Sequence, residues 1–140
     1  MSENLAGKAA LVTGGAKRVG AAICRRLHAQ GANVMLHHRA SVAEARALQH
    51  ELNTKRAGSV ALIQADLLKS ASLPDLVKTT VSQFGSLDVL INNASSFFAT
   101  AIGDINEKAW EDLIGTNLKA PLFLSQAAAA ELRKRHGCIV

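Results

Sequence analysis

Short apolar runs alternate along the chain with longer segments in which apolar positions recur every three to four residues. The short runs have the length of buried strands and the longer segments have the period of helices. We expect strands at 9–13, 33–37, 60–65 and 89–92, and helices at 19–30, 42–55, 73–84 and 108–135. Alternating strands and helices of this kind predict a doubly wound α/β fold, a parallel sheet with helices on both faces.

The whole chain, 1–140, is expected to form one domain, because no linker, repeat or low-complexity tract interrupts this alternation. A glycine follows each expected helix, and glycine is the residue that most easily adopts the left-handed conformation of a helix C-cap. These glycines are Gly31, Gly58, Gly85 and Gly137. The residues after Gly137 would begin a fifth strand.

Composition narrows the possible functions. The formal net charge is +5, but the 16 Lys and Arg are spread along the chain and only 4% of residues are aromatic, so base-stacking platforms for nucleic acid are lacking. Lys119 and Gln126 interrupt the longest apolar stretch, and the N-terminus has no signal-peptide pattern, so we expect a cytoplasmic protein. Cys24 and Cys138 lie far apart without metal-ligand spacing, so no metal site is expected.

The first strand runs directly into a glycine turn and then into an amphipathic helix. Gly14 can adopt backbone angles closed to other residues, and the free amides at the helix start favour an anion. Lys17 and Arg18 would be unfavourable at the N-terminus of an isolated helix, but they suit a bound polyanion. The spacing differs from G-x-G-x-x-G, and a tight turn without a ligand is the alternative. The predicted phosphate-binding residues are Gly14, Lys17, Arg18, Val19 and Gly20.

The end of the second strand indicates which dinucleotide would bind. Enzymes that use NAD place an acidic residue about twenty residues past the glycine turn, where it holds the ribose 2′-hydroxyl. Here the sequence has no carboxylate before Glu44, and a 2′-phosphate would meet His38, Arg39 and Ser41. We therefore expect NADPH rather than NADH, the alternative being a solvated turn with incidental histidines.

A second motif, Asn92-Asn93-Ala94, closes the fourth strand. Together with the Thr13-Gly14 turn and Gly20, it resembles the short-chain dehydrogenase/reductases, and the resemblance covers 8–140. Arg18 and the run Ser95-Ser96-Phe97 are similar to the pteridine reductase branch of that family. The resemblance implies a Rossmann-like sheet, truncated here at the start of its fifth strand.

The resemblance also implies roles for individual residues. Asp66 and Leu67 would form the adenine pocket, and Asn93, Ala94 and Ser95 would contact the nicotinamide ribose and the central part of the cofactor. From the residues alone, Asp66 could equally accept hydrogen bonds from backbone amides.

Three further assignments concern substrate and catalysis. Phe97 would stack a flat heteroaromatic substrate, with Arg18 and Ser95 as further substrate contacts, although a loop-packing phenylalanine is the alternative. Asn117 would kink the long helix and hold a water in the proton relay, whereas its simplest interpretation is a surface polar residue. His28, His50 and His136 lack ligand spacing and are interpreted as surface histidines.

The resemblance further implies a catalytic Tyr-x-x-x-Lys pair beyond the fifth strand, and the chain contains no tyrosine. We therefore expect the N-terminal part of a longer enzyme, a homotetramer when full length. The leading hypothesis is an NADPH-dependent reductase acting on a pterin or a folate-like pteridine. One alternative is a carbonyl or ketoacyl reductase with the same cofactor half and a different pocket, against which Arg18 and Ser95-Ser96-Phe97 count. The other is a non-catalytic NADPH-binding module.

Overall fold

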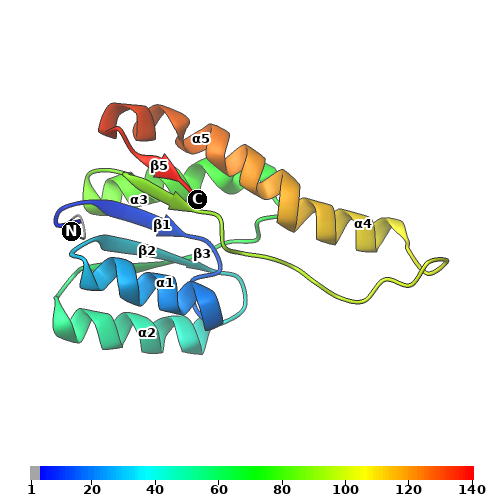
Figure 1. Cartoon of the computed structure of the whole chain (residues 1–140), viewed down its shortest axis with the longest axis horizontal. Helices are drawn as coiled ribbons and strands as arrows, with labels where there is room; N and C mark the ends of the chain where they lie inside the picture. The colour runs from blue at the N-terminus through cyan, green and yellow to red at the C-terminus, as the bar shows by residue number, and fades with distance from the viewer. Residues whose placement is uncertain (1–3) are drawn as a thin grey trace.

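The computed structural model describes residues 4–140 and shows one parallel sheet with helices on both faces (Figure 1). The strands are β1 (Ala9–Val12), β2 (Asn33–His38), β3 (Val60–Gln64), β4 (Val89–Ile91) and β5 (Cys138–Ile139). The helices are α1 (Arg18–Ala29), α2 (Val42–Lys55), the short η1 (Ser70–Ser72), α3 (Leu73–Phe84), α4 (Glu107–Ile114), the π-helical η2 (Gly115–Lys119) and α5 (Ala120–Arg135). The doubly wound α/β prediction is confirmed.

The strand order β3-β2-β1-β4-β5 creates a switch point beside β1. The chain passes from β1 outward through β2 to β3, and then crosses to the other side of β1 to form β4. The connections therefore leave in opposite directions from the carboxyl ends of β1 and β4, and open α/β sheets bind ligands in the crevice formed there.

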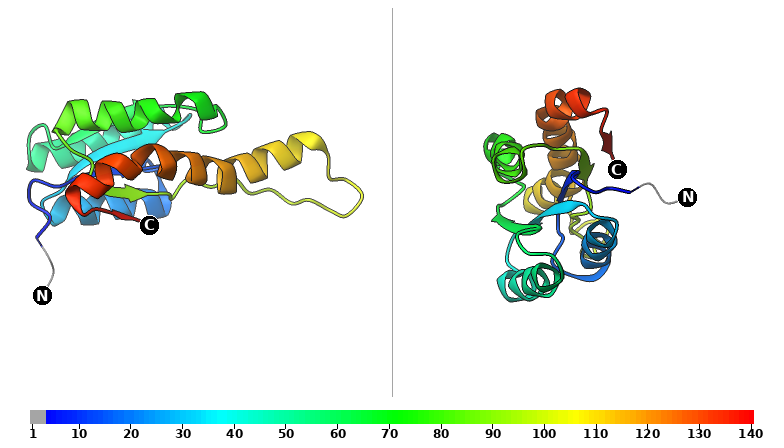
Figure 2. Two further views of the ribbon diagram at one scale, coloured as in Figure 1. Left: turned by 90° about the horizontal axis from the view of Figure 1, so that it is seen from above. Right: turned by 90° about the vertical axis from the view of Figure 1, so that its left-hand side faces the viewer.

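Two apolar layers hold the sheet between its helices, because alternate strand residues face opposite sides. Leu11, Met35 and Leu90 pack with α3 and α5, whereas Val12, Leu36 and their neighbours pack with α1 and α2. Figure 2 shows the two pairs of helices on opposite sides of the sheet. All of these strand residues are buried, so burial on both faces fixes the register of the central strands.

The structure corrects details of the sequence analysis. The helix expected at 108–135 is divided, because η2 interrupts it with π-type hydrogen bonding between α4 and α5. The left-handed residue after α5 is His136, with φ +51°, and not Gly137. Gly137 is needed for space, since a Cβ there would collide with the carbonyl oxygen of Asp88. His28 is buried beside the hydroxyl of Ser59 rather than on the surface.

Gly31 and Gly85 have positive φ at the ends of α1 and α3, as predicted. Gly58 also has positive φ, but it is not the cap of α2, because that helix ends at Lys55 and its C-cap is Arg56 in an extended conformation. Across the described part of the chain, no helix is both long enough and apolar enough to cross a membrane.

Candidate functional site

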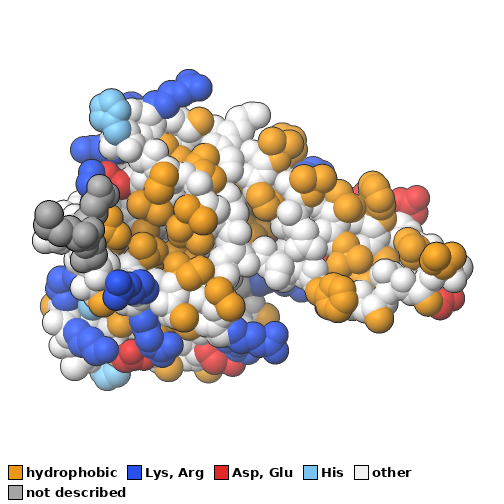
Figure 3. All heavy atoms as spheres, in the orientation of Figure 1, with side chains coloured by type: hydrophobic (Ala, Val, Ile, Leu, Met, Phe, Trp, Pro, Cys, Tyr) orange, Lys and Arg blue, Asp and Glu red, His pale blue; other side chains and the backbone are white. Residues whose placement is uncertain are grey.

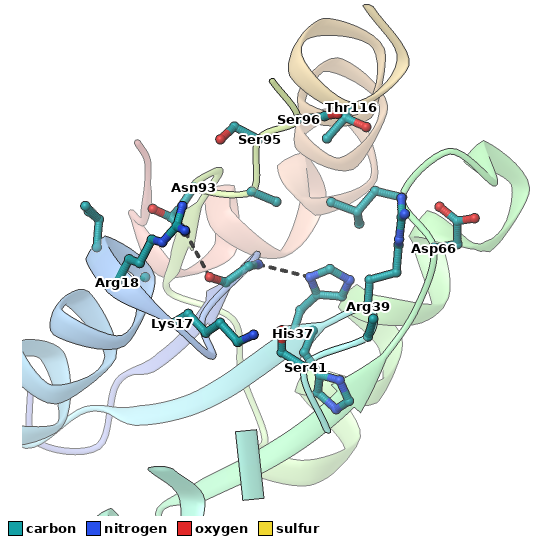
Figure 4. A pocket seen from close by; sticks show the side chains of 17 residues that line it. Lys17, Arg18, His37, Arg39, Ser41, Asp66, Asn93, Ser95, Ser96 and Thr116 are labelled. Atoms are coloured by element: carbon teal, nitrogen blue, oxygen red, sulfur yellow. Dashed lines mark hydrogen bonds between the residues drawn. The ribbon is translucent and has the colours of Figure 1, made fainter. Parts of the chain in front are cut away.

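A cavity of about 590 Å³ lies at the carboxyl edge of the sheet, where the switch point was located. Its walls come from the glycine turn, the end of β2, the segment after β3 and the loop after β4 (Figure 4). The lining residues are Gly14, Lys17, Arg18, Val19, Gly20, His37, His38, Arg39, Ala40, Ser41, Asp66, Leu67, Asn93, Ala94, Ser95, Ser96 and Thr116. Every residue that the sequence analysis assigned to the cofactor is among them.

The glycine turn is bonded to the segment that follows β4 by the side chains of Thr13 and Asn93. The hydroxyl oxygen of Thr13 accepts hydrogen bonds from the amides of Asn93 and Ala94, both at 3.0 Å. The Asn93 amide group returns bonds to the carbonyl oxygens of Thr13 and Gly14, at 3.0 and 3.1 Å. These reciprocal bonds explain why Asn93 follows the fourth strand, since a buried backbone turn needs partners for its polar groups.

Two glycines of the turn permit its close approach to neighbouring chain. Gly14 has φ +61°, and a Cβ there would come within 2.9 Å of the Ala94 Cα. A Cβ at Gly20 would collide with the carbonyl oxygen of Gly14 and lie 2.6 Å from the Asn93 side-chain nitrogen. Both positions therefore require glycine for steric reasons, as the sequence analysis expected.

Helix α1 begins at the cavity with open backbone donors. Its N-cap is Lys17, and no side chain within residues 4–140 caps it. The Ala21 amide makes a 3.1 Å bond to the carbonyl oxygen of Lys17, so the amides of Arg18, Val19 and Gly20 precede the first hydrogen bond of the helix. The helix dipole adds partial positive charge at this end. The arrangement can hold a phosphate group.

The two cations of the turn are held differently. Lys17 forms a 2.7 Å ion pair with Glu44 of α2, and this contact lowers the pKa of the Glu44 carboxyl group. Arg18 is exposed and has φ +49°, a left-handed conformation that is costly for a residue with a side chain. Such strain at the mouth of a cavity is typical of a functional position.

The end of β2 contributes two buried histidines. His37 accepts a 3.1 Å hydrogen bond from the Gly14 amide, and its other ring nitrogen is 3.0 Å from the carbonyl oxygen of Ala65. The Nδ1 atom of His38 is buried and has no hydrogen-bond partner within residues 4–140. Burial lowers the pKa of both rings, with the positive charge of Arg46 contributing for His38. Arg39 and Ser41 continue this wall, and Figure 4 shows Arg18 and Arg39 flanking the cavity.

Asp66 follows β3 and lies at the edge of the cavity. Its carboxylate accepts a 3.1 Å hydrogen bond from the Leu68 amide. Asp66 therefore accepts a hydrogen bond from a backbone amide, which was the alternative role expected from the sequence. Asp66 and Leu67 both line the cavity.

Asn117 lies in η2, where the long helix departs from α-helical geometry. Its side chain donates to the Ser96 carbonyl oxygen at 2.8 Å and accepts from the Ser96 amide at 3.0 Å. Ser96 also donates its hydroxyl hydrogen to the carboxylate of Asp112. Asn117 therefore ties the loop after β4 to η2, although its side chain does not line the cavity.

Phe97 is not part of the cavity wall. Its side chain is 91% exposed, whereas the neighbouring Phe98 is 41% exposed. The loop-packing alternative therefore does not describe Phe97, and its proposed stacking role stays a prediction.

Four of the lining residues were not predicted from the sequence, namely His37, Ala40, Ser96 and Thr116. His37 stood beside the assigned His38, and strand alternation alone places neighbouring side chains on opposite faces. Its bond to Gly14 joins residues 23 positions apart, which no local pattern reveals. In the described part of the chain, no three His, Cys, Asp or Glu side chains come together as a metal site.

Known proteins resemble this chain in sequence and structure. The chain is 37% identical over 134 residues to a 3-oxoacyl-[acyl-carrier-protein] reductase of Staphylococcus epidermidis, covering 95% of this chain and 54% of that protein. It is 38% identical over 151 residues to pteridine reductase 1 of Leishmania tarentolae, covering 86% and 52% respectively. The chain therefore spans about half the length of the curated relatives it matches.

A crystal structure of a blue fluorescent protein from a metagenomic library, in complex with NADPH, is similar with a TM-score of 0.88 and 39% identity. The match covers 93% of this chain and 53% of that one. Residues 8–140 also match the family model described as short chain dehydrogenase. The chain therefore belongs to the short-chain dehydrogenase family.

Proposed function

We propose that this chain forms the NADPH-binding part of a short-chain reductase whose substrate is a pterin. NADPH would supply the hydride, and the residues of this chain bind and orient it. The chain contains no tyrosine, so none of its side chains takes the proton-donor role that the resemblance gives to a tyrosine.

The end of β2 carries the choice of NADPH. His38, the Arg39 guanidinium and the Ser41 hydroxyl line the same wall, and no carboxylate occurs between β2 and Glu44. A 2′-phosphate at this wall would meet the planar guanidinium of Arg39, which can donate two parallel hydrogen bonds to it, and the hydroxyl of Ser41. A ribose 2′-hydroxyl would find no acidic partner at this place.

The remaining assignments follow the course of the cavity. The amides at the start of α1, with Gly14, Lys17 and Arg18, bind the pyrophosphate. Asp66 and Leu67 receive the adenine, while Asn93, Ala94 and Ser95 position the nicotinamide ribose. Asn117 positions the loop through Ser96 and belongs to the proton relay.

The pterin assignment is supported by Arg18, by Ser95 and by the exposed Phe97. An aromatic side chain beside the nicotinamide end of the cavity would stack a flat bicyclic substrate. A β-ketoacyl reductase is the second candidate, because the Staphylococcus epidermidis relative named for that activity covers 95% of the chain. A non-catalytic NADPH-binding module would retain only the cofactor site.

The cofactor assignment is tested by titrating the protein with NADPH and NADH, using tryptophan or nicotinamide fluorescence. Arg39→Ala should weaken NADPH by about 1–2 kcal/mol, roughly tenfold in Kd, because it removes one charged hydrogen bond. NADH binding should barely change. Arg26→Ala is the matched control, because it removes the same charge at a position in the last turn of α1 that does not line the cavity. Equal losses of NADPH and NADH affinity in Arg39→Ala would contradict the 2′-phosphate assignment.

The substrate assignment is tested by NADPH oxidation with dihydrobiopterin, dihydrofolate and a β-ketoacyl thioester, using the longer protein that this proposal implies, because this chain contains no tyrosine to donate the proton. Turnover with the pterins supports the proposal, and turnover with the thioester alone replaces it with the second candidate. NADPH binding without turnover of any of the three favours the binding module.

A further inference from the structure

One buried side chain joins the carboxyl ends of three neighbouring strands at the cavity. His37 is the penultimate residue of β2 and is only 2% exposed. Its Nδ1 atom is 3.1 Å from the Gly14 amide, just after β1, and its Nε2 atom is 3.0 Å from the Ala65 carbonyl oxygen, just after β3. The backbone carbonyl of His37 also accepts a 2.9 Å bond from the Gly15 amide. Figure 4 shows the ring pointing toward the glycine turn.

These partners fix the protonation state of the ring. The Gly14 amide can only donate, so Nδ1 must present its lone pair, and the Ala65 carbonyl can only accept, so Nε2 must carry the hydrogen. The neutral Nε2–H tautomer satisfies both contacts. An imidazolium would place an N–H group against the Gly14 N–H, and the bond to the turn would be lost.

We propose that His37 is a positioning residue of the cofactor site, whose neutral ring holds the glycine turn, so that protonating this ring loosens the turn and weakens NADPH binding. The inference rests on the proposed function, because it takes NADPH as the ligand. Gly14 is the position that matters, since its carbonyl oxygen also receives the Asn93 side chain and lies against Gly20. The turn is thus held through its amide by His37 and through its carbonyl by Asn93.

The charges around the ring act in both directions. Burial lowers the pKa of His37, the neighbouring His38 lowers it further, and Asp66 together with the bond to Ala65 opposes both. The other charged groups of the cavity wall are the cations Lys17, Arg18 and Arg39. These groups favour the neutral ring in the free protein. A bound polyanion would by itself favour the charged ring, so the direction of the pH effect on affinity tests whether the lost bond dominates.

Two substitutions separate the two contacts of the ring. His37→Asn retains an acceptor near the position of Nδ1 but cannot reach Ala65, and His37→Gln retains a donor near Nε2 but loses the acceptor at Gly14. Neither side chain titrates. At about pH 7.5, His37→Gln should bind NADPH about tenfold more weakly than wild type, whereas His37→Asn should recover most of that loss.

The decisive readout is the pH profile of the NADPH Kd between about pH 7.5 and pH 5.5. The 2′-phosphate itself takes up a proton near pH 6, so the profile of His37→Asn serves as the baseline for this common effect. The wild-type Kd should rise more than that baseline as the pH falls, by less than about tenfold at pH 5.5, because the pKa of His37 lies below its ordinary value of 6.5. His50→Gln is the control, because His50 is exposed on α2 and outside the cavity, and its profile should follow the wild type.

Failure of the inference differs from failure of the proposed function. Wild type that binds no NADPH at any pH overturns the proposed function and the inference with it. Wild type that binds NADPH with the same profile as His37→Asn, or more tightly in acid than that baseline, overturns only the role of His37.

A measurement on the wild-type protein covers the case in which a variant does not fold. Long-range ¹H–¹⁵N correlation spectra distinguish the two neutral tautomers and the charged ring. At about pH 7.5 the His37 ring should appear as the neutral Nε2–H tautomer. A neutral Nδ1–H tautomer or a charged ring at that pH would overturn the proposal.

Discussion

Two segments border the cavity, and they are held in opposite ways. The glycine turn, 13–20, is bonded to the segment after β4 through Thr13 and Asn93 and to β2 through His37. The loop 92–106, after β4, is tied to the helices near its start by Ser96, and farther along it exposes Phe97 and Ile102, the latter completely. In Figures 1 and 3 this loop and α4 project from the sheet and carry a group of apolar side chains.

This difference indicates which side of the cavity is ordered before a ligand binds. These hydrogen bonds hold the turn in the absence of any ligand, so we expect a dinucleotide to lose little affinity to ordering it. Residues 97–108, in the far part of the loop and the start of α4, are all exposed, so we expect the shape of this part in a substrate complex to depend on what binds there. We infer that the cofactor side of the cavity is preformed and the substrate side is adaptable.

The largest effect on stability and NADPH binding is expected from a glycine-to-alanine substitution in the glycine turn, compared with the same substitution in the loop after β4. Gly20→Ala should destabilise the protein by about 3 kcal/mol or more and abolish NADPH binding, because its Cβ would collide with Gly14. Gly103→Ala, in the loop, has φ +100° but no atom within 4 Å of its Cβ, so about 1–2 kcal/mol of backbone strain is expected. Urea unfolding and NADPH titration measure both effects. Retained NADPH affinity in Gly20→Ala would show that the turn is not rigid.

The second effect is on the pH dependence of stability. Burial lowers the pKa of His28, His37 and His38 below the ordinary value of 6.5, so the folded state keeps these rings neutral while the unfolded state takes up protons. The unfolded state binds more protons below about pH 6.5, so the free energy of unfolding should fall as the pH falls from there. Urea midpoints measured from about pH 7.5 to pH 5.5 test this, and His37→Asn should flatten part of the slope. If the free energy of unfolding of His37→Asn depends on pH as steeply as that of the wild type, the His37 ring does not contribute to the pH dependence.

The sequence predicted the preformed segment much better than the rest of the site. Strand and helix periods, with Gly14 and Gly20, are local patterns, so both the sheet and the turn follow from them. The π-helical η2 was not predicted from the sequence, because Asn117 and Asp112 form hydrogen bonds there with Ser96, which lies in the distant loop after β4. The contacts of His37 were missed for the same reason, since they join three strands that only the folded sheet brings together.

The burial of His28 and the exchange of roles between His136 and Gly137 are also consequences of packing. Ser59 and Arg56 surround His28 from a separate part of the chain. Position 137 requires glycine because a Cβ there would collide with the Asp88 carbonyl oxygen. The left-handed residue that ends the helix is the preceding one, His136. The helical period of the sequence predicts neither the burial of His28 nor the left-handed conformation of His136.

A smaller effect separates strain from charge at the mouth of the cavity. Arg18→Gly and Arg18→Ala both remove the guanidinium, but only glycine relieves the cost of φ +49°. The glycine variant should therefore be more stable than the alanine variant by about 1 kcal/mol, while both weaken NADPH to a similar extent. Thermal unfolding of the two variants gives the difference. Equal stabilities would mean that the left-handed turn at Arg18 carries no strain.

The smallest effect on stability is expected in the loop. Phe97→Ala should change the free energy of unfolding by less than about 0.5 kcal/mol, because the side chain is 91% exposed and packs against little. If Phe97 stacks the substrate, the same substitution in the longer protein that the proposal implies should raise the KM for dihydrobiopterin severalfold while the KM for NADPH stays the same. Phe98→Ala is the matched control, since that ring is more buried and should cost stability rather than substrate affinity. Unaltered pterin kinetics in Phe97→Ala would remove the ring from the substrate site, and a change in the NADPH KM would mean that the loop supports the preformed side as well.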